Sequence, residues 1–179
     1  MNPSSRNMEQ PRHIPWEEYS RLCRILARRI SEDHKPDTVV GIAHGGVIVG
    51  ATIATILGRD FFPIKLSRRV NARVVRKRAK MLVPPTADLG EKLVLLVDDA
   101  SRSGETLKAA IRSIKGHKPR KIITAVLVRS GEYAPDYYAS YFAGDVRFPW
   151  QLEETPESGE DTYDKNRKTE NNTGEGKKK

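Results

Sequence analysis

Apolar residues in this chain fall into short runs that alternate with segments of helical periodicity. The clearest run covers residues 93–97, where five apolar residues follow one another without alternation. That pattern is typical of a strand buried on both faces of a parallel sheet. Similar patterns predict further strands at 38–42, 61–66 and 121–128, and two short late strands at 137–142 and 146–148.

Helices are predicted between these strands. Apolar side chains recur at helical spacing through residues 16–30, with arginines between them, which predicts an amphipathic helix packed on the sheet. Residues 47–57 contain no charged residue, so the helix predicted there is expected in the interior. A further helix is predicted over 105–115. This alternation favours an α/β fold with a central, mainly parallel sheet flanked by helices, similar to a Rossmann fold.

The two ends of the chain lack this pattern. Residues 1–15 are polar and contain prolines, which predicts a loose N-terminal arm. Residues 151–179 contain one aromatic residue, eight acids and six bases without periodicity, which predicts a disordered tail. A single domain is therefore expected over residues 16–150.

Charge and cysteine content narrow the function classes. The net charge is +9, and residues 1–150 hold 26 Lys and Arg against 15 Asp and Glu, which favours polyanionic partners such as nucleic acid or a phosphorylated small molecule. Cys23 is the only cysteine, so an intramolecular disulfide and a multi-cysteine zinc site are excluded. No signal peptide is recognisable and no apolar run approaches the ~18 residues of a membrane span, so a cytoplasmic protein without membrane contact is expected.

A polar turn follows residues 93–97 directly. Asp98 and Asp99 stand at the carboxyl end of the predicted strand, the edge at which open α/β sheets bind ligands. Free amides at a helix amino terminus and hydroxyl donors hold a phosphate, whereas carboxylates accept hydrogen bonds from ribose hydroxyls. The turn therefore predicts a site for a sugar phosphate. The residues that lead from the acids into the predicted helix are Ala100, Ser101, Arg102, Ser103, Gly104, Glu105 and Thr106.

Two other interpretations of this turn compete with a sugar-phosphate site. The paired acids also resemble the start of a response-regulator receiver domain, where carboxylates hold Mg²⁺. That fold needs a strand-ending Asp further along, but the strand at 121–128 is followed by Arg129. The other alternative is a purely structural strand end and helix cap, which is disfavoured because two adjacent buried acids are costly without a partner.

A second, glycine-containing turn follows the strand at 38–42. Ala43, His44, Gly45 and Gly46 lead into an apolar helix. Glycines allow a backbone to approach phosphate closely, and a helix amino terminus offers unpaired amides. On its own this pattern also fits a tight connection without a ligand.

Together the two turns resemble those of the type I phosphoribosyltransferases, in particular the hypoxanthine, xanthine and guanine enzymes. The resemblance implies that residues 43–46 bind the diphosphate of phosphoribosyl diphosphate, with a non-proline cis peptide near Ala43–His44. It implies that Asp98 and Asp99 act catalytically on the ribose hydroxyls and contact Mg²⁺ indirectly, through substrate or water. Residues 100–106 would bind the 5-phosphate. The implied partners are phosphoribosyl diphosphate and a purine base, with Mg²⁺ as cofactor, and homodimer formation is left open.

The resemblance also indicates where a base would bind. Arg129 occupies a position where purine enzymes commonly carry a Lys, and Val146 and Phe148 lie where a backbone segment and an aromatic ring contact the purine. Phe148 is equally compatible with a core role. Arg102 departs from the family pattern, because many purine members carry an Asp at this position near the base. The identity of the base is therefore open.

Residues 68–80 form a basic stretch with seven Lys and Arg and no acid. It fits a solvated loop, a nucleic-acid patch or the flexible hood that closes over pyrophosphate in the phosphoribosyltransferases. A patch for single-stranded nucleic acid is disfavoured because no aromatic residue is interleaved with the bases. The hood is favoured, since a closing lid excludes water and strengthens the charge contacts beneath it.

The sequence thus predicts an enzyme of nucleotide salvage. It would transfer the 5-phosphoribosyl group from phosphoribosyl diphosphate to a purine base and release pyrophosphate. The alternative is a regulator that retains the fold, senses nucleotides and binds nucleic acid without catalysis. The positive charge, the basic stretch and Arg102 fit that alternative, and nucleic acid is expected as a partner only in that case.

Overall fold

The computed structural model describes residues 10–67, 69–70, 73–74 and 80–151, and a six-stranded sheet forms the centre of this part. The strand order is β6-β3-β2-β7-β8-β9, and all neighbours are parallel except β3 and β6. The predicted mainly parallel α/β sheet is therefore confirmed. The strands are β2 (Thr38–Ile42), β3 (Asp60–Ser67), β6 (Lys80–Val83), β7 (Leu93–Ser101), β8 (Lys121–Arg129) and β9 (Tyr137–Tyr141).

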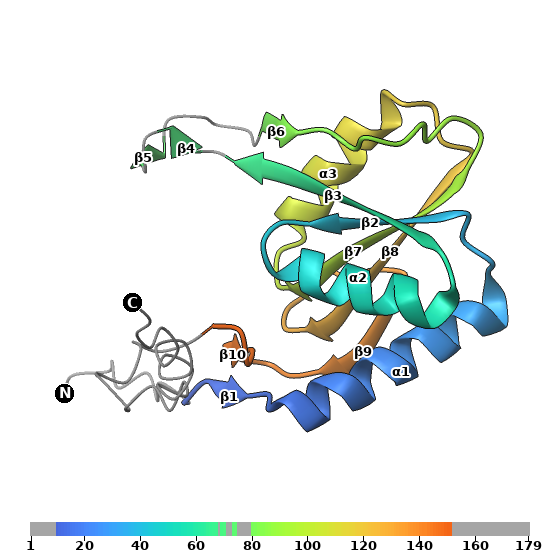
Figure 1. Ribbon diagram of the computed structural model, residues 1–179. Helices are drawn as coiled ribbons and strands as arrows, with labels where there is room; N and C mark the ends of the chain where they lie inside the picture. Colours follow the sequence, from blue (N-terminus) through green and yellow to red (C-terminus); the bar gives the residue numbers. More distant parts are fainter. Residues whose placement is uncertain (1–9, 68, 71–72, 75–79, 152–179) are drawn as a thin grey trace, which may run out of the picture.

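Helices cover both faces of this sheet. Figure 1 shows α1 (Trp16–Asp33) and α2 (Gly45–Leu57) on one face and α3 (Glu105–Lys115) on the other. Alternate residues of β7 enter two separate cores, so that Leu95 packs on the side of α1 and α2 and Leu96 on the side of α3. Successive strand side chains point to opposite faces, which is why a doubly covered strand requires an uninterrupted apolar run.

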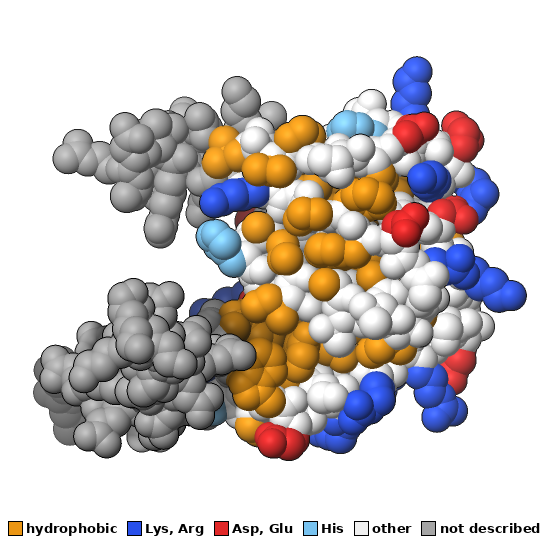
Figure 2. All heavy atoms as spheres, in the orientation of Figure 1, with side chains coloured by type: hydrophobic (Ala, Val, Ile, Leu, Met, Phe, Trp, Pro, Cys, Tyr) orange, Lys and Arg blue, Asp and Glu red, His pale blue; other side chains and the backbone are white. Residues whose placement is uncertain are grey.

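The helix α2 lies less deep than its sequence predicts. Ile56 on this helix is 46% exposed, and Figure 2 shows hydrophobic side chains gathered on the face of the molecule where α2 lies. The expectation of an interior helix is therefore wrong for its outer side, because α2 is the outer layer over the sheet within the described part of the chain. By contrast, Cys23 and Leu26 in the apolar stripe of α1 are completely buried. This burial raises the pKa of the Cys23 thiol to about 11.

Segments near both ends of the domain pair with each other. The strand β1 (Arg12–His13) runs parallel to β10 (Val146–Arg147), and Ile14 is buried. Residues 12–14 are thus not a loose arm, since this pairing and the burial of Ile14 hold them to the domain. Gln151, predicted as the start of the tail, also belongs to the folded part, because its side chain accepts a hydrogen bond from the Phe148 amide. The rest of the predicted arm and tail, residues 1–9 and 152–179, lies outside the described residues.

Most of the basic stretch, namely residues 68, 71–72 and 75–79, lies outside the described residues. The hood therefore stays a prediction. Its described parts form β4 (Arg69–Val70) and β5 (Arg73–Val74), an antiparallel pair, followed by the antiparallel edge strand β6. Among the described residues, no helix is both long and apolar enough to span a bilayer.

Candidate active site

The two predicted turns lie on neighbouring strands. The pairing of β7 with β2 stops at Val97, opposite Gly41, whereas its pairing with β8 continues to Ser101, opposite Arg129. The strand therefore extends past its predicted end at 97, because one neighbour is longer than the other. Asp98 stands on this extension, beyond the end of the β2 ladder, where the turn into α2 crosses.

The turn after β2 packs directly on these acids. A Cβ on Gly45 would overlap the Asp99 carboxylate, and a Cβ on Gly46 would lie 2.6 Å from the Val97 carbonyl oxygen. Both positions therefore require glycine, because any side chain would force the turns apart. The Ala43–His44 peptide bond is cis, as the resemblance implies. The structure thus brings residues 43–46 and the acid pair together at one edge of the sheet.

Asp98 is buried, Asp99 is half-buried, and neither has a counter-charge among the described residues. Asp98 is only 8% exposed, and burial together with the neighbouring Asp99 carboxylate raises its pKa well above the ordinary value. Burial also raises the pKa of Asp99. The pair accepts backbone hydrogen bonds, from the Asp99 amide at 3.0 Å and the Ala100 amide at 2.7 Å. No ion pair joins either carboxylate to a basic side chain within the described residues, so the pair would gain from a cation or from hydroxyl donors.

The turn between β7 and α3 passes through Gly104 in the left-handed region and leads directly into the helix. Gly104 has φ +72°, and a Cβ there would collide with the Tyr133 ring, so glycine is required for both reasons. The Ser101 hydroxyl is buried and has no hydrogen-bond partner among the described residues. Ser103 and Thr106 are exposed at the amino terminus of α3. This helix end therefore offers hydroxyl and amide donors to an anion.

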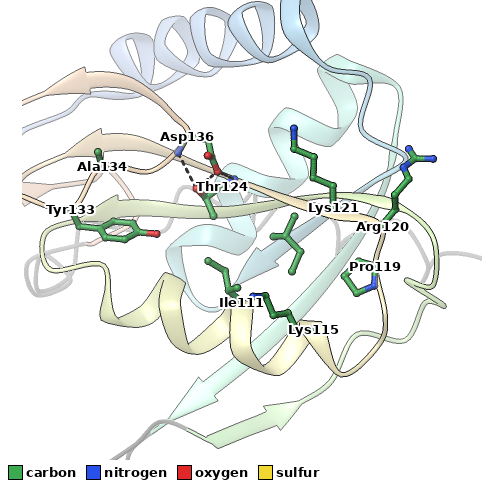
Figure 3. Close-up of a pocket in the computed structure, with 10 residues that line it drawn as sticks. Ile111, Lys115, Pro119, Arg120, Lys121, Thr124, Tyr133, Ala134 and Asp136 are labelled. Carbon is green, nitrogen blue, oxygen red and sulfur yellow. Dashed lines mark hydrogen bonds between the residues drawn. The ribbon is translucent and has the colours of Figure 1, made fainter.

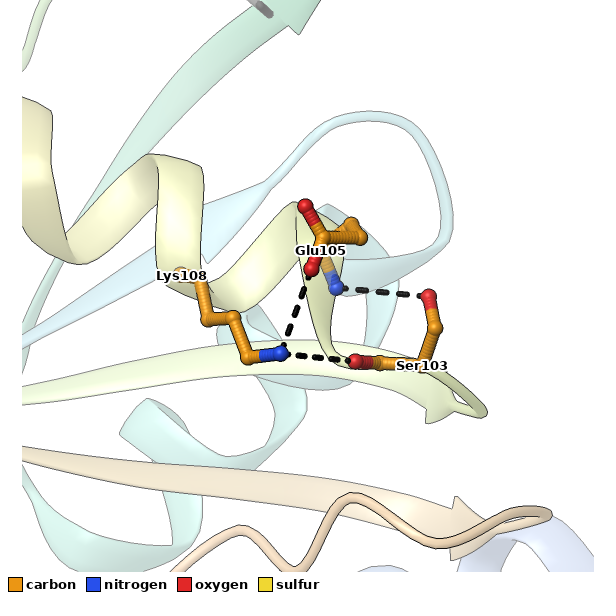
Figure 4. A network of polar contacts seen from close by, with 3 residues as sticks. All are labelled: Ser103, Glu105 and Lys108. Atoms are coloured by element: carbon orange, nitrogen blue, oxygen red, sulfur yellow. Dashed lines mark hydrogen bonds and ion pairs between the residues drawn. The ribbon is translucent and has the colours of Figure 1, made fainter.

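Lys108 links the turn to the first residues of α3. Its Nζ donates to the Ser103 carbonyl and to the Glu105 carboxylate, both at 3.2 Å, and Figure 4 shows the three residues together. The Glu105 amide in turn donates to the Ser103 hydroxyl over a long 3.5 Å. Glu105 is therefore engaged by Lys108 in this structure rather than directed at a ligand. The lysine places a positive charge beside the turn.

The two arginines assigned to the site are both engaged with protein groups. Arg102 Nη1 lies 3.3 Å from Asp145 Oδ1, and both side chains are largely exposed. Arg129 donates to the carbonyls of Gly131 and Glu132 at 3.0 and 3.1 Å. Within the described residues, neither guanidinium forms a hydrogen bond or an ion pair with Asp98 or Asp99. A contact with substrate would require each of them to exchange these partners.

The predicted base-contacting residues lie in the last strand and just after it. Val146, in β10, is half-buried. Phe148 is only 4% exposed and stacks on Trp150 with ring centroids 4.8 Å apart, inside the core shared with Tyr19. Of the two interpretations of Phe148, the structure supports the core role, because its ring has almost no surface left for a ligand.

Two residues near the site carried no signal in the sequence pattern. Tyr133 donates its backbone amide to the Arg102 carbonyl at 3.3 Å and places its ring against Gly104. Asp145 supplies the partner of Arg102. Both contacts join segments far apart along the chain. The only local hint was Gly104 itself, since a glycine at a helix start suggests close approach by another group.

The comparisons with known proteins agree with this geometry. A family model described as a phosphoribosyl transferase domain matches residues 15–157. The chain belongs to this family. Phosphoribosyltransferase-family relatives include the bifunctional protein PyrR of Ralstonia nicotianae, 31% identical over 134 residues, which span 70% of this chain and 77% of that protein.

Other proteins similar to this chain carry different names. The transcriptional regulator GfcR of Archaeoglobus fulgidus is 27% identical over 65% of this chain and 63% of its own length. Among solved structures, the purine phosphoribosyltransferase of Pyrococcus horikoshii Ot3 superposes with a TM-score of 0.73 at 27% identity, covering 84% of this chain and 99% of that one. The family is therefore settled, whereas these names describe an enzyme, a regulator and a bifunctional protein.

Proposed function

We propose that this phosphoribosyltransferase transfers the 5-phosphoribosyl group of phosphoribosyl diphosphate to a purine base. The C1′–oxygen bond to pyrophosphate breaks, a C1′–nitrogen bond to the base forms, and the base loses a proton. The observation that carries the proposal is the contact between the two turns, in which Gly45 leaves no space for a side chain beside Asp99. Backbone amides for a diphosphate, carboxylates for a ribose and a helix terminus for a phosphate thus occur side by side.

Each part of the substrate meets a chemically matched part of the chain. The turn with Gly45 and Gly46 would face the diphosphate, since it exposes backbone at close range. Asp98 and Asp99 would accept hydrogen bonds from the ribose hydroxyls. The phosphate would bind at residues 101–106, where the α3 dipole and the hydroxyls favour negative charge.

The acid pair has a second role in the reaction. If the ribose develops positive charge as pyrophosphate leaves, carboxylates nearby stabilise that charge more in the transition state than in the ground state. Burial raises the pKa of both acids, which indicates that they are held in a weakly solvated place. A charge in such a place acts strongly on a bound cationic group.

The donor set fits a Mg²⁺ ion that is held mainly by the substrate. Mg²⁺ prefers oxygen ligands, and Asp98 and Asp99 offer carboxylate oxygens. No group of three or more His, Cys, Asp or Glu that could hold a metal occurs in the described part of the chain. The two acids would thus contact the ion indirectly, through substrate or water, without forming a complete site. Bound Mg²⁺ would neutralise charge on the departing diphosphate.

A purine is the favoured acceptor. The support is the Pyrococcus horikoshii purine enzyme, whose chain this one matches over 99% of its length. Arg129 lies at the end of β8, next to the acid-bearing end of β7, so a base placed beyond the ribose would lie near it. An Arg at this position offers a planar pair of donors to an exocyclic oxygen.

A regulatory function is the second candidate, favoured by the similarity to the GfcR regulator and by the positive charge of the chain. One experiment separates the two. Labelled phosphoribosyl diphosphate and Mg²⁺ are incubated with the protein and hypoxanthine, xanthine, guanine or adenine in turn. Formation of a nucleotide from at least one base is expected. Absence of product with every base, together with tight, salt-dependent binding of RNA or DNA, would support the regulator instead.

A further inference from the structure

A cavity of about 400 Å³ lies on the α3 side of the sheet, at the opposite end from the acid pair. It opens between the last turns of α3, the start of β8 and the loop that leads into β9 (Figure 3). None of its lining residues belongs to the proposed active site. They are Ile111, Lys115, Pro119, Arg120, Lys121, Ile122, Thr124, Tyr133, Ala134 and Asp136.

The walls of this cavity suit a flat apolar group. Ile111, Ile122 and Pro119 provide aliphatic surface, and in Figure 3 the phenol of Tyr133 points toward the middle of the lining residues. Polar and apolar side chains both line the cavity, and small-molecule sites combine apolar surface with polar groups that orient the ligand. The phenol hydroxyl forms no hydrogen bond with the described residues, so it is available to a ligand as donor or acceptor.

Among the described basic residues that line the cavity, Lys115 is the one whose side chain has no partner. Arg120 pairs with Asp37 at 3.3 Å, and the Lys121 amine lies 3.5 Å from His34 Nε2, both away from Ile111 in Figure 3. Lys115 forms no ion pair or hydrogen bond with its side chain in the described part of the chain.

The carboxylate that lines the cavity, Asp136, already accepts hydrogen bonds from the protein. One Asp136 carboxylate oxygen accepts from the Thr124 amide and hydroxyl, each at 2.7 Å. The cavity therefore presents one free ammonium beside apolar walls and a phenol. One free cation fits a ligand with a single anionic group better than a polyphosphate or a nucleic-acid strand.

We propose that this cavity is a second binding site, for a planar ring that carries one phosphate or carboxylate. The ring packs between Ile111 and Ile122, and the Tyr133 hydroxyl forms a hydrogen bond with the edge of the ring. The Lys115 ammonium forms an ion pair with the anionic group of the ligand. A nucleoside monophosphate and an aromatic carboxylate share this chemistry.

Tyr133 connects this cavity to the turn between β7 and α3, where the phosphate is proposed to bind. Its ring lies against Gly104, its amide donates to the Arg102 carbonyl, and the Lys108 amine lies 5.2 Å from its ring centre. A ligand that shifts Tyr133 therefore shifts the turn. The expected consequence, which rests on the proposed function, is an altered affinity for phosphoribosyl diphosphate.

The test uses the full chain, amide-resolved NMR and three probes: guanosine 5′-monophosphate, benzoate and inorganic phosphate. The amides of Lys115, Ile122 and Ala134 are expected to shift with the ring-bearing probes and not with phosphate. A shift with the nucleotide alone, or with benzoate alone, identifies which ring-bearing class the site takes. Shifts confined to residues 43–46 and 101–106, or the same shifts with phosphate alone, would overturn the proposal.

Two variants of the cavity and one control outside it give the matched comparison. Lys115→Ala is expected to weaken ligand binding at the cavity at least tenfold, and Tyr133→Phe severalfold. Arg112→Ala removes the same charge from the same exposed side of α3 but lies outside the lining, so it should change affinity less than twofold. Equal losses of affinity in Lys115→Ala and Arg112→Ala would mean that the ligand responds to the overall positive charge of α3 and not to a specific contact with Lys115.

The coupling has a readout that does not depend on the proposed function. The Gly104 amide should shift when benzoate fills the cavity, and this shift should vanish in Lys115→Ala. A cavity that fills without moving Gly104 would refute the coupling. Binding of phosphoribosyl diphosphate is measured separately, with an expected change of at least threefold when benzoate is bound. Failure of phosphoribosyl diphosphate to bind at all would count against the proposed function, while the shifts at Lys115 and Gly104 would still stand.

Discussion

The turns after β2 and after β7 meet at one edge of the sheet but differ in what they contribute. The first provides shape, because Gly45 and Gly46 allow contacts that no side chain would permit. The second carries the polar side chains of Asp98, Asp99 and Ser103, to which the proposed function assigns the ribose hydroxyls and the phosphate. A change in the first turn should therefore act as a steric block. A change in the second should remove one interaction and leave the rest of the site in place.

The largest effect is expected from Gly45→Ala. The new methyl group would overlap the Asp99 carboxylate, so both turns must move. Overpacking of this kind costs about 1–3 kcal/mol of unfolding free energy. Binding of phosphoribosyl diphosphate, measured by calorimetry, should weaken at least 100-fold, or fall below detection.

Gly58→Ala is the control at the other end of the same helix. Gly58 has φ +62° and no atom within 4 Å of its added Cβ, so the substitution adds backbone strain alone. It should cost about 1–2 kcal/mol of stability and leave affinity unchanged. If both variants lose affinity equally, the steric role given to Gly45 is wrong.

The next effect concerns the acid pair. Asp98→Asn together with Asp99→Asn should lower turnover by about 100-fold or more, because the charges that stabilise the ribosyl cation are lost. The same change should raise thermal stability at neutral pH, since it removes two weakly solvated charges that have no cationic partner among the described residues. Turnover and melting temperature are measured on the same preparations, with the exposed Asp60→Asn as control. If the double variant turns over at the wild-type rate, the two acids have no role in the reaction.

The stability gain of that double variant should depend on pH. In the unfolded chain both carboxyls ionise near pH 4, whereas burial keeps the pKa of both higher in the folded protein. The folded wild type therefore binds more protons than the unfolded chain above pH 4, and its stability falls as pH rises. The difference in melting temperature between wild type and variant should be small near pH 4 and grow toward neutral pH. A constant difference would contradict the raised pKa values.

A smaller effect is expected at the hydroxyls of the second turn. Ser103→Ala should weaken binding of phosphoribosyl diphosphate about tenfold, since a hydrogen bond to a charged group contributes about 1.5 kcal/mol. The control is Ser113→Ala on the same helix, whose hydroxyl donates to the Ala109 carbonyl away from the turn. Affinity is measured by calorimetry. Equal losses of affinity in the two variants would show that a general change in the helix, and not the Ser103 hydroxyl, is responsible.

The smallest effect is expected from the exposed pair Arg102–Asp145. Such a pair contributes about 0–1 kcal/mol, and Asp145→Ala frees Arg102 for the substrate phosphate. Affinity should therefore increase by up to about threefold, and the increase should disappear at high salt. A decrease in affinity at low salt would mean that Asp145 is needed for binding.

Much of the framework could be predicted from local pattern. The strand β2 and the helix α3 occur at the predicted residues 38–42 and 105–115. These elements are specified locally, by an apolar run or by one amphipathic face. The end of β7 was placed too early because polar Asp98 breaks the apolar run, although pairing with β8 carries the strand on to Ser101.

Contacts between distant segments could not be predicted in this way. The pairing of β1 with β10 and the stacking of Phe148 on Trp150 depend on how the finished domain closes. No local pattern distinguishes an aromatic residue that closes a core from one that faces a ligand. For the same reason the pairing of Arg102 with Asp145, 43 residues further along the chain, could not be predicted.

The sequence by itself determined the layer order and the chemical groups at two strand ends, because apolar periodicity and side-chain identity are local properties. Only the tertiary structure decided that Gly45 lies against Asp99, that neither acid has a basic partner among the described residues, and that Tyr133 lies between the turn at Gly104 and a separate cavity. Those facts depend on which strands become neighbours. Neighbours are selected by the packing of the whole sheet, so no short segment encodes them alone.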